Sequence, residues 1–172
     1  PLKGAIAVVL AGTGPVGQRA ARLLAREGAT VRLASRNLDR AAAAAKAVCE
    51  AISQDNVTGH AAPTAKELAG LLDGASIVIA AGAPGIELLP ASVRTACKSL
   101  RVAIDLNAVA PLGIEGVQPN EKGTEREGVV CYGALGVGGK KMKIHKAALR
   151  QLFERNDQVL DAEEIYALGA DA

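Results

Sequence analysis

The residues best suited to chemistry in this sequence form a glycine-rich hexapeptide at positions 12–17. Its glycines stand at the first, third and sixth places, directly after an apolar stretch and before a stretch with helical spacing. The first glycine permits a tight turn, the second lets the backbone approach a pyrophosphate, and the third lets helix and strand pack closely. A glycine turn that only packs is the plainer alternative. The pattern favours a dinucleotide site formed by Gly12, Thr13, Gly14, Pro15, Val16 and Gly17.

The kind of dinucleotide depends on the residues that end the second apolar stretch. NAD sites usually carry an acid there, which accepts a hydrogen bond from the adenosine ribose. This sequence has Ser35 and Arg36 instead, and a guanidinium can bind a 2′-phosphate through two parallel hydrogen bonds. The residues therefore predict NADP as the better cofactor, with NAD left open as an alternative. Arg40, about one helical turn further on, is equally consistent with this role and with a solvated surface.

Small and polar residues that follow two later apolar stretches are expected at the same edge of the sheet. Ligands gather where parallel strands end, so we expect Ala81, Gly82 and Asn107 beside the nicotinamide half of the cofactor. A plain turn is the alternative at Gly82, and Asp105 is equally consistent with a loop cap. No catalytic residue is assigned, because in hydride transfer the cofactor carries the chemistry and the protein orients it.

Composition excludes several other classes of protein. Lys and Arg number 20 against 18 Asp and Glu, and aromatic residues make up 2% of the chain, which argues against a nucleic-acid partner. The apolar runs are only as long as strands, so we expect no membrane span and a cytoplasmic protein. We expect no metal, since His60 and His145 are far apart and neither is near paired cysteines.

The elements that must position these residues alternate along the whole chain. Apolar strands that alternate with helices predict an α/β fold: a Rossmann-like, doubly wound parallel sheet in three αβα layers, with residues 1–172 as one domain. We expect strands at 6–11, 31–34, 57–61, 77–81, 102–106 and 129–132, helices at 90–100 and 140–153 and after Gly14, Asn37, Thr64 and Asp161, a loop at 108–128, and a glycine-rich segment at 133–139.

Taken together, these motifs resemble the NADP-binding half of bacterial methylene-tetrahydromethanopterin dehydrogenases. The resemblance spans the chain and rests on residues 12–17, 35–36, 81–83, 87–90, 107, 111–114, 133–139, 141, 143, 145, 153–154 and 161–166. It implies oxidation of a methylene bridge to the methenyl form, with hydride passed to NADP⁺, in one-carbon and formaldehyde metabolism. It also implies a reduced pterin substrate, with tetrahydrofolate or NAD⁺ used by some relatives, and a homo-oligomer.

Members of that family carry an additional N-terminal domain that supplies much of the pterin site, and no part of this sequence corresponds to it. We therefore expect this chain to be the cofactor domain of such an enzyme. Two other interpretations remain open. One is the domain of a shikimate-type NADP dehydrogenase, and the other is a free-standing NADP-binding module that senses or regulates without turnover.

Overall fold

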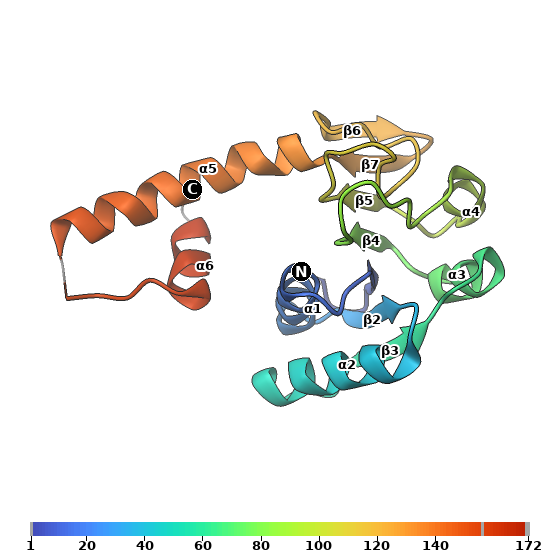
Figure 1. Ribbon diagram of the computed structural model, residues 1–172, viewed down its shortest axis with the longest axis horizontal. Helices are drawn as coiled ribbons and strands as arrows, with labels where there is room; N and C mark the ends of the chain where they lie inside the picture. Colours follow the sequence, from blue (N-terminus) through green and yellow to red (C-terminus); the bar gives the residue numbers. More distant parts are fainter. Residues whose placement is uncertain (1, 156, 171–172) are drawn as a thin grey trace.

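A mostly parallel sheet forms the centre of the protein. The computed structural model describes residues 2–155 and 157–170, and within them seven strands pair in the order β3-β2-β1-β4-β5-β7-β6 (Figure 1). Every pair is parallel except β6 with β7. The strands are β1 (Ile6–Leu10), β2 (Thr30–Ser35), β3 (Val57–Ala61), β4 (Ile77–Ala80), β5 (Val102–Asp105), β6 (Lys122–Arg126) and β7 (Val129–Tyr132).

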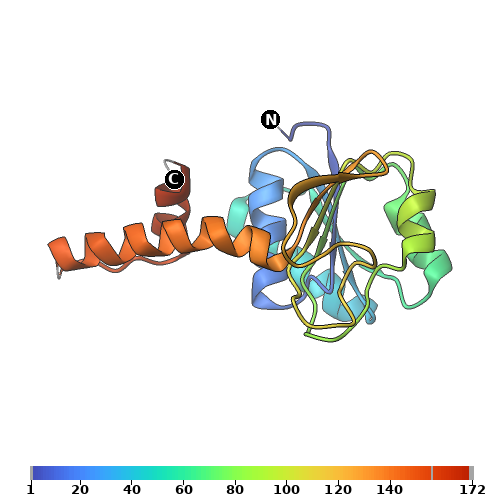
Figure 2. The same cartoon turned by 90° about the horizontal axis from the view of Figure 1, so that it is seen from above.

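Helices cover both faces of this sheet (Figure 2). On one face lie α1 (Pro15–Arg26) and α2 (Leu38–Ile52), and on the other lie α3 (Ala65–Leu72) and α4 (Ala91–Ala96). The predicted Rossmann-like, three-layer fold is confirmed. The long helix α5 (Ala134–Glu154) projects away from the sheet, and α6 (Ala162–Ala170) folds back toward α1.

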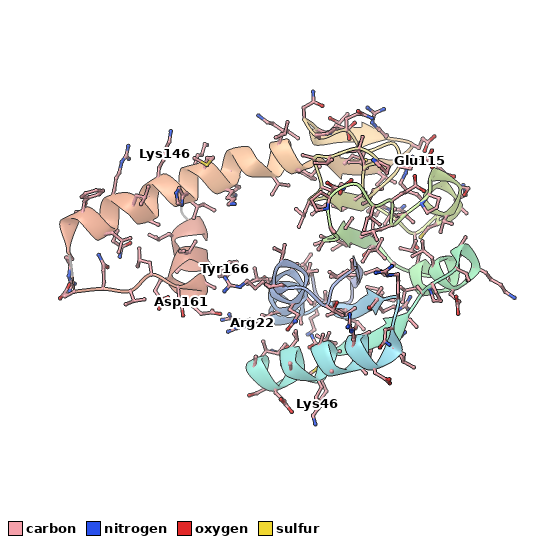
Figure 3. All side chains as sticks on the ribbon, in the orientation of Figure 1. Arg22, Lys46, Glu115, Lys146, Asp161 and Tyr166 are labelled. Carbon is pink, nitrogen blue, oxygen red and sulfur yellow. The ribbon has the colours of Figure 1, made fainter. Side chains whose placement is uncertain are left out.

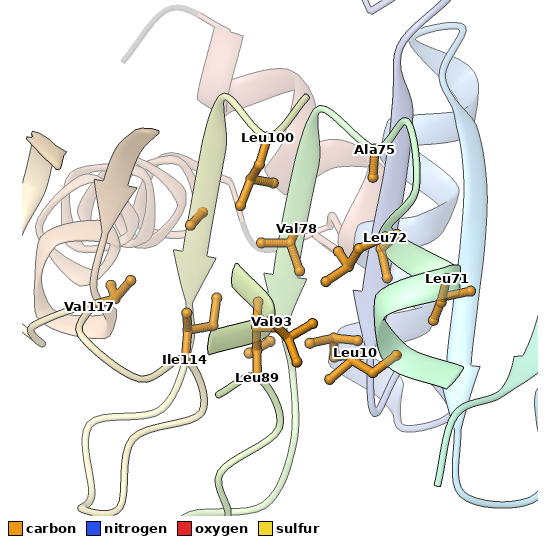
Figure 4. Close-up of a cluster of buried hydrophobic side chains, with 14 of the residues drawn as sticks. Leu10, Leu71, Leu72, Ala75, Val78, Leu89, Val93, Leu100, Ile114 and Val117 are labelled. Carbon is orange, nitrogen blue, oxygen red and sulfur yellow. The ribbon is translucent and has the colours of Figure 1, made fainter. Parts of the chain in front are cut away.

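The two faces are packed by side chains of different size. Alanines of α1 and α2, among them Ala21 and Ala45, lie against the side chains of Val9 and Leu33, so these helices approach the strands closely. The opposite face is filled by leucines of α3, such as Leu72, and by branched strand residues (Figure 4). Full burial of one such side chain contributes about 1.5–3 kcal/mol.

Three segments differ from the sequence-based expectation. The segment expected as a loop at 108–128 contains β6, whose five residues are all exposed, so no apolar pattern marked it as a strand. It pairs antiparallel with β7 at the edge of the sheet. The helix expected at 90–100 is shorter, since α4 spans Ala91–Ala96.

The glycine-rich segment at 133–139 is a helix rather than a connection, because α5 begins at Ala134. Its glycines allow close packing of the helix start against the preceding loop. A Cβ on Gly133 would lie 2.0 Å from the carbonyl oxygen of Gln118, and one on Gly136 would lie 1.8 Å from that of Glu121. No side chain larger than hydrogen fits at either position.

Charged side chains hold α6 against α1. Glu163 forms ion pairs with Arg22 at 2.5 Å and Arg26 at 2.6 Å. The hydroxyl of Tyr166 donates a hydrogen bond to Glu27 at 3.2 Å, and Figure 3 shows Tyr166 and Arg22 between the two helices. Among the described residues, no helix is both long and apolar enough to cross a membrane.

Candidate functional site

The order of the strands reverses at the edge of the sheet where β1 and β4 end, and in open α/β sheets such a switch point forms the ligand-binding crevice. The chain passes from β1 to β2 and β3 on one side and then crosses to β4 on the other, and dinucleotides bind at such a reversal. The sequence-predicted residues all lie at this edge. Residues 12–17 follow β1, Ser35 and Arg36 lie at the end of β2, Ala81 and Gly82 follow β4, and Asn107 follows β5.

Two glycines of the loop, Gly12 and Gly17, are tightly packed, whereas Gly14 is open. The N–H of Gly12 donates to the carbonyl oxygen of Ala34 at 3.0 Å, which ties the loop to β2. A Cβ on Gly12 would lie 2.7 Å from the side chain of Leu33, and one on Gly17 would lie 2.5 Å from the Cα of Gly12. A Cβ on Gly14 would meet no heavy atom within 4 Å in the described structure. The loop therefore presents its backbone outward at Gly14.

The start of α1 has the properties of an anion site. Gly14 is its N-cap, Pro15 occupies the first turn, and within the described residues neither a capping side chain nor a first-turn acid competes for the free N–H groups. These groups and the positive end of the helix dipole favour a phosphate. The residues present fit the pyrophosphate of a dinucleotide.

Gln18 stabilises this loop through a contact that sequence reasoning missed. Its side-chain amide donates a hydrogen bond of 2.7 Å to the carbonyl oxygen of Thr13, and its backbone N–H continues the helix to Gly14. The Thr13 peptide is thereby fixed. The only signal in the sequence is a donor one residue after the last glycine, which is too general to have been found.

The end of β2 presents positive charge beside the start of a second helix. Arg36 is exposed and forms no ion pair with any described residue. The hydroxyl of Ser35 accepts a hydrogen bond from the N–H of Asn37 at 3.3 Å and keeps its own proton to donate. Asn37 caps α2 by accepting from the N–H of Arg40 at 2.9 Å, so Arg40 also lies at this end, near the exposed Asp39.

The loops after β4 and β5 form the other half of the crevice. A Cβ on Gly82 would lie 2.7 Å from the Leu88 side chain, so these two residues pack closely in this wall. Asn107 is 5% exposed. Its amide oxygen accepts from the N–H of Val109 at 3.0 Å, and its amide nitrogen donates to the carbonyl oxygen of Pro111 at 3.4 Å. The side chain thus orders its own loop, and its contact with a cofactor stays a prediction.

Two titratable groups with shifted pKa values lie on strands away from the β1–β4 crevice. Burial and the charge of Arg32 lower the pKa of His60 on β3. Burial, with the charge of Glu121, raises the pKa of the Cys131 thiol on β7, which keeps it protonated and unreactive. Neither shift marks an acid–base group at the dinucleotide crevice.

Comparison with known proteins assigns this chain to a family. Residues 4–113 match the family described as "Putative NAD(P)-binding". These residues contain the glycine loop, the ends of β2, β4 and β5, and the buried loop at Asn107. The chain therefore belongs to this NAD(P)-binding family.

Two proteins of Methylorubrum extorquens are homologous to nearly the whole chain. "Bifunctional protein MdtA" is 49% identical over 167 residues, which cover 97% of this chain and 58% of that protein. "NAD(P)-dependent methylenetetrahydromethanopterin dehydrogenase" is 30% identical over 181 residues, which cover 99% of this chain and 58% of that protein. The resemblance stated from the motifs is confirmed, and the chain spans 58% of the length of each relative.

Solved structures share the fold. A transhydrogenase from Sinorhizobium meliloti superposes with a TM-score of 0.61 at 25% identity, over 80% of this chain and 39% of that one. A quinate dehydrogenase from Corynebacterium glutamicum, solved in complex with NAD, gives a TM-score of 0.55 at 18% identity, over 100% of this chain and 56% of that one. These structures share the Rossmann-like fold of this chain, and the matching family shows it to be an NAD(P)-binding domain.

Proposed function

We propose that this chain is the cofactor domain of a dehydrogenase that oxidises methylene-tetrahydromethanopterin, or methylene-tetrahydrofolate, to the methenyl form with NADP⁺. One observation carries the choice of cofactor: Arg36 lies exposed at the end of β2, on the same edge as the uncapped start of α1. The substrate class is supported by the similarity to the two Methylorubrum proteins, one of which is named for this reaction.

Each half of the crevice has its own task in this proposal. The backbone N–H groups at the start of α1 hold the pyrophosphate, with the open side of Gly14 allowing close approach. Arg36 and Ser35 hold the 2′-phosphate, the guanidinium by charge and the hydroxyl by donation. The wall at Ala81 and Gly82 and the loop of Asn107 orient the nicotinamide ring, which accepts the hydride when bound.

The remaining features of the protein follow from the same proposal. A reduced pterin is the substrate, and the enzyme is a homo-oligomer that serves one-carbon metabolism in the cytoplasm. The similarity covers 58% of each relative, and in those relatives the residues outside the matched part are proposed to supply pterin contacts.

Titration of the 172-residue chain with NADPH and NADH tests the cofactor assignment. The sequence contains no Trp, so the fluorescence of the nicotinamide can be followed without that background. We expect tighter binding of NADPH. Equal affinity for both would refute the role of Arg36 and Ser35, and failure to bind either would refute the site.

The substrate class needs a separate assay. Formation of NADPH is measured with methylene-tetrahydromethanopterin, methylene-tetrahydrofolate and shikimate, using the 172-residue chain and, where its gene encodes a longer polypeptide, that polypeptide as well. Turnover of a methylene-pterin supports the proposal. Turnover of shikimate alone would favour a shikimate-type enzyme, and NADPH binding without any turnover would favour a regulatory module.

A further inference from the structure

The loops that follow β4 and β5 are joined into one unit by backbone hydrogen bonds. The carbonyl oxygen of Gly113 accepts the N–H groups of Leu88 at 2.9 Å and Leu89 at 3.0 Å. The N–H of Glu115 donates to the carbonyl oxygen of Leu89 at 3.0 Å, and Leu89 pairs with Ile114 as an isolated parallel bridge. Figure 4 shows both of these side chains in the cluster of buried hydrophobic residues. A shift of one loop therefore moves the other.

A single carboxylate fixes this unit to the sheet. Asp105, the last residue of β5, is 1% exposed. Its Oδ1 accepts the N–H of Asn107 at 2.9 Å, and its Oδ2 accepts the N–H of Ile114 at 2.8 Å. The two oxygens thus hold both ends of the loop between them. A Cβ on Gly113 would lie 2.7 Å from Oδ1, so the loop backbone packs directly on the carboxylate.

The contacts lead from this carboxylate to the wall of the crevice. Gly113 packs on Asp105 and accepts from the N–H of Leu88, and the side chain of Leu88 packs where a Cβ on Gly82 would lie. Burying a carboxylate costs free energy that an apolar residue would not incur. The benefit of the charge is two strong, directed hydrogen bonds that define one loop geometry.

We propose that Asp105 is a positioning residue for the nicotinamide half of bound NADP(H). Its carboxylate sets the spacing between the wall at Gly82 and the loop of Asn107, and so the orientation in which the ring is held. This inference rests on the proposed function, which puts the nicotinamide over β4 and β5 and the adenosine over β2. Asp105 therefore affects one half of the cofactor and leaves the other half unchanged.

Binding measurements on the variant Asp105→Asn distinguish the nicotinamide half of the cofactor from the adenosine half. The amide oxygen accepts one of the two N–H groups, but its NH₂ group faces the other, so two donors oppose each other. Binding of NADPH is compared with binding of adenosine 2′,5′-bisphosphate, which carries the 2′-phosphate and lacks the nicotinamide. We expect NADPH to bind about tenfold more weakly, which corresponds to about 1.4 kcal/mol, while the bisphosphate binds within about twofold of the wild type, less than about 0.5 kcal/mol.

Asp55→Asn is the matched control, because it makes the same chemical change at an exposed position, and it should bind both ligands as the wild type does. If Asp105→Asn fails to fold, Gly113→Ala answers the same question, since its methyl group displaces the carboxylate from the loop. Thermal unfolding is recorded for each variant, so that binding is measured well below Tm.

The outcomes separate this inference from the function on which it rests. Selective loss of NADPH affinity supports the positioning role. Equal weakening of both ligands, or no change in either, would show that Asp105 only stabilises the fold or has no role, and the inference fails although the wild type binds NADPH. A wild type that binds the bisphosphate as tightly as NADPH overturns the nicotinamide site itself.

Discussion

Replacement of Gly14 by alanine should separate binding from folding. Gly14 has φ −78° and ψ 168°, which alanine adopts without strain, and a Cβ there meets no described heavy atom within 4 Å. The free energy of unfolding should therefore fall by no more than about 1 kcal/mol, the cost of alanine in place of a good residue at an N-cap. The new methyl group stands where the pyrophosphate approaches the backbone. Binding of NADPH and NADH should weaken alike, because both carry the pyrophosphate.

The size of the binding loss follows from the same geometry. To keep the methyl group out of van der Waals overlap, the pyrophosphate must withdraw and lengthen its hydrogen bonds to the start of α1. Loss of even one charge-assisted hydrogen bond costs about 1.5–3 kcal/mol, so we expect a decrease of at least about tenfold in affinity. Fluorescence titration with each cofactor measures this decrease, and thermal unfolding measures the stability.

Gly17→Ala is the contrasting variant. Its Cβ would lie 2.5 Å from the Cα and 2.7 Å from the carbonyl oxygen of Gly12, and backbone atoms cannot move aside as a flexible side chain can. Overpacking of this kind costs about 1–3 kcal/mol, and each 1 kcal/mol lowers Tm by about 2–4 °C in a domain of this size.

The result for Gly14→Ala decides the interpretation of the loop. If Gly14→Ala bound both cofactors with wild-type affinity, the interpretation of the glycine loop as a pyrophosphate site would be refuted.

Three further predictions concern single side chains. Arg36→Ala should weaken NADPH binding by about 1.5–3 kcal/mol through loss of a charged hydrogen bond and spare NADH; equal loss for both cofactors in parallel titrations would contradict this. Gln18→Ala frees the Thr13 carbonyl oxygen and should weaken both cofactors by about 0.5–1.5 kcal/mol, whereas an unchanged Kd would show that the loop holds its shape without this contact. Hydrogen bonding to Arg26, with the nearby arginine charges, lowers the pKa of Glu163 from its ordinary value of 4.5, so the contact between α6 and α1 is fully present above that value and is lost as pH falls through the lowered pKa. The protection factors of the α6 amides, which are corrected for the intrinsic pH dependence of hydrogen exchange, should fall over that pH range in the wild type and be lower already at neutral pH in Glu163→Gln. Equal protection in both proteins at neutral pH would show that the ion pairs do not hold α6.

The sequence by itself determined the parts of this protein that depend on local signals. Apolar runs of strand length predicted the parallel strands, because a strand buried on both faces is apolar at every position. The helix expected after Thr64 is α3, and Thr64 forms a capping box with Glu67 in which both hydrogen bonds are present. The glycine spacing at 12–17 predicted a strand, a turn and a helix, since Gly17 packs against the backbone of Gly12, only five residues away.

Only the tertiary structure decided the features that join distant segments. The exposed strand β6 exists because β7 offers it backbone partners, and the glycines at the start of α5 are required by the loop at Gln118 and Glu121. The two bonds of Asp105 were equally out of reach, since one joins residues nine positions apart and its loop then binds the loop after β4. Such contacts depend on the spacing of strands in the folded sheet, which no local pattern encodes. The sequence located the ends of the strands, and the packing of their loops determined the shape of the crevice.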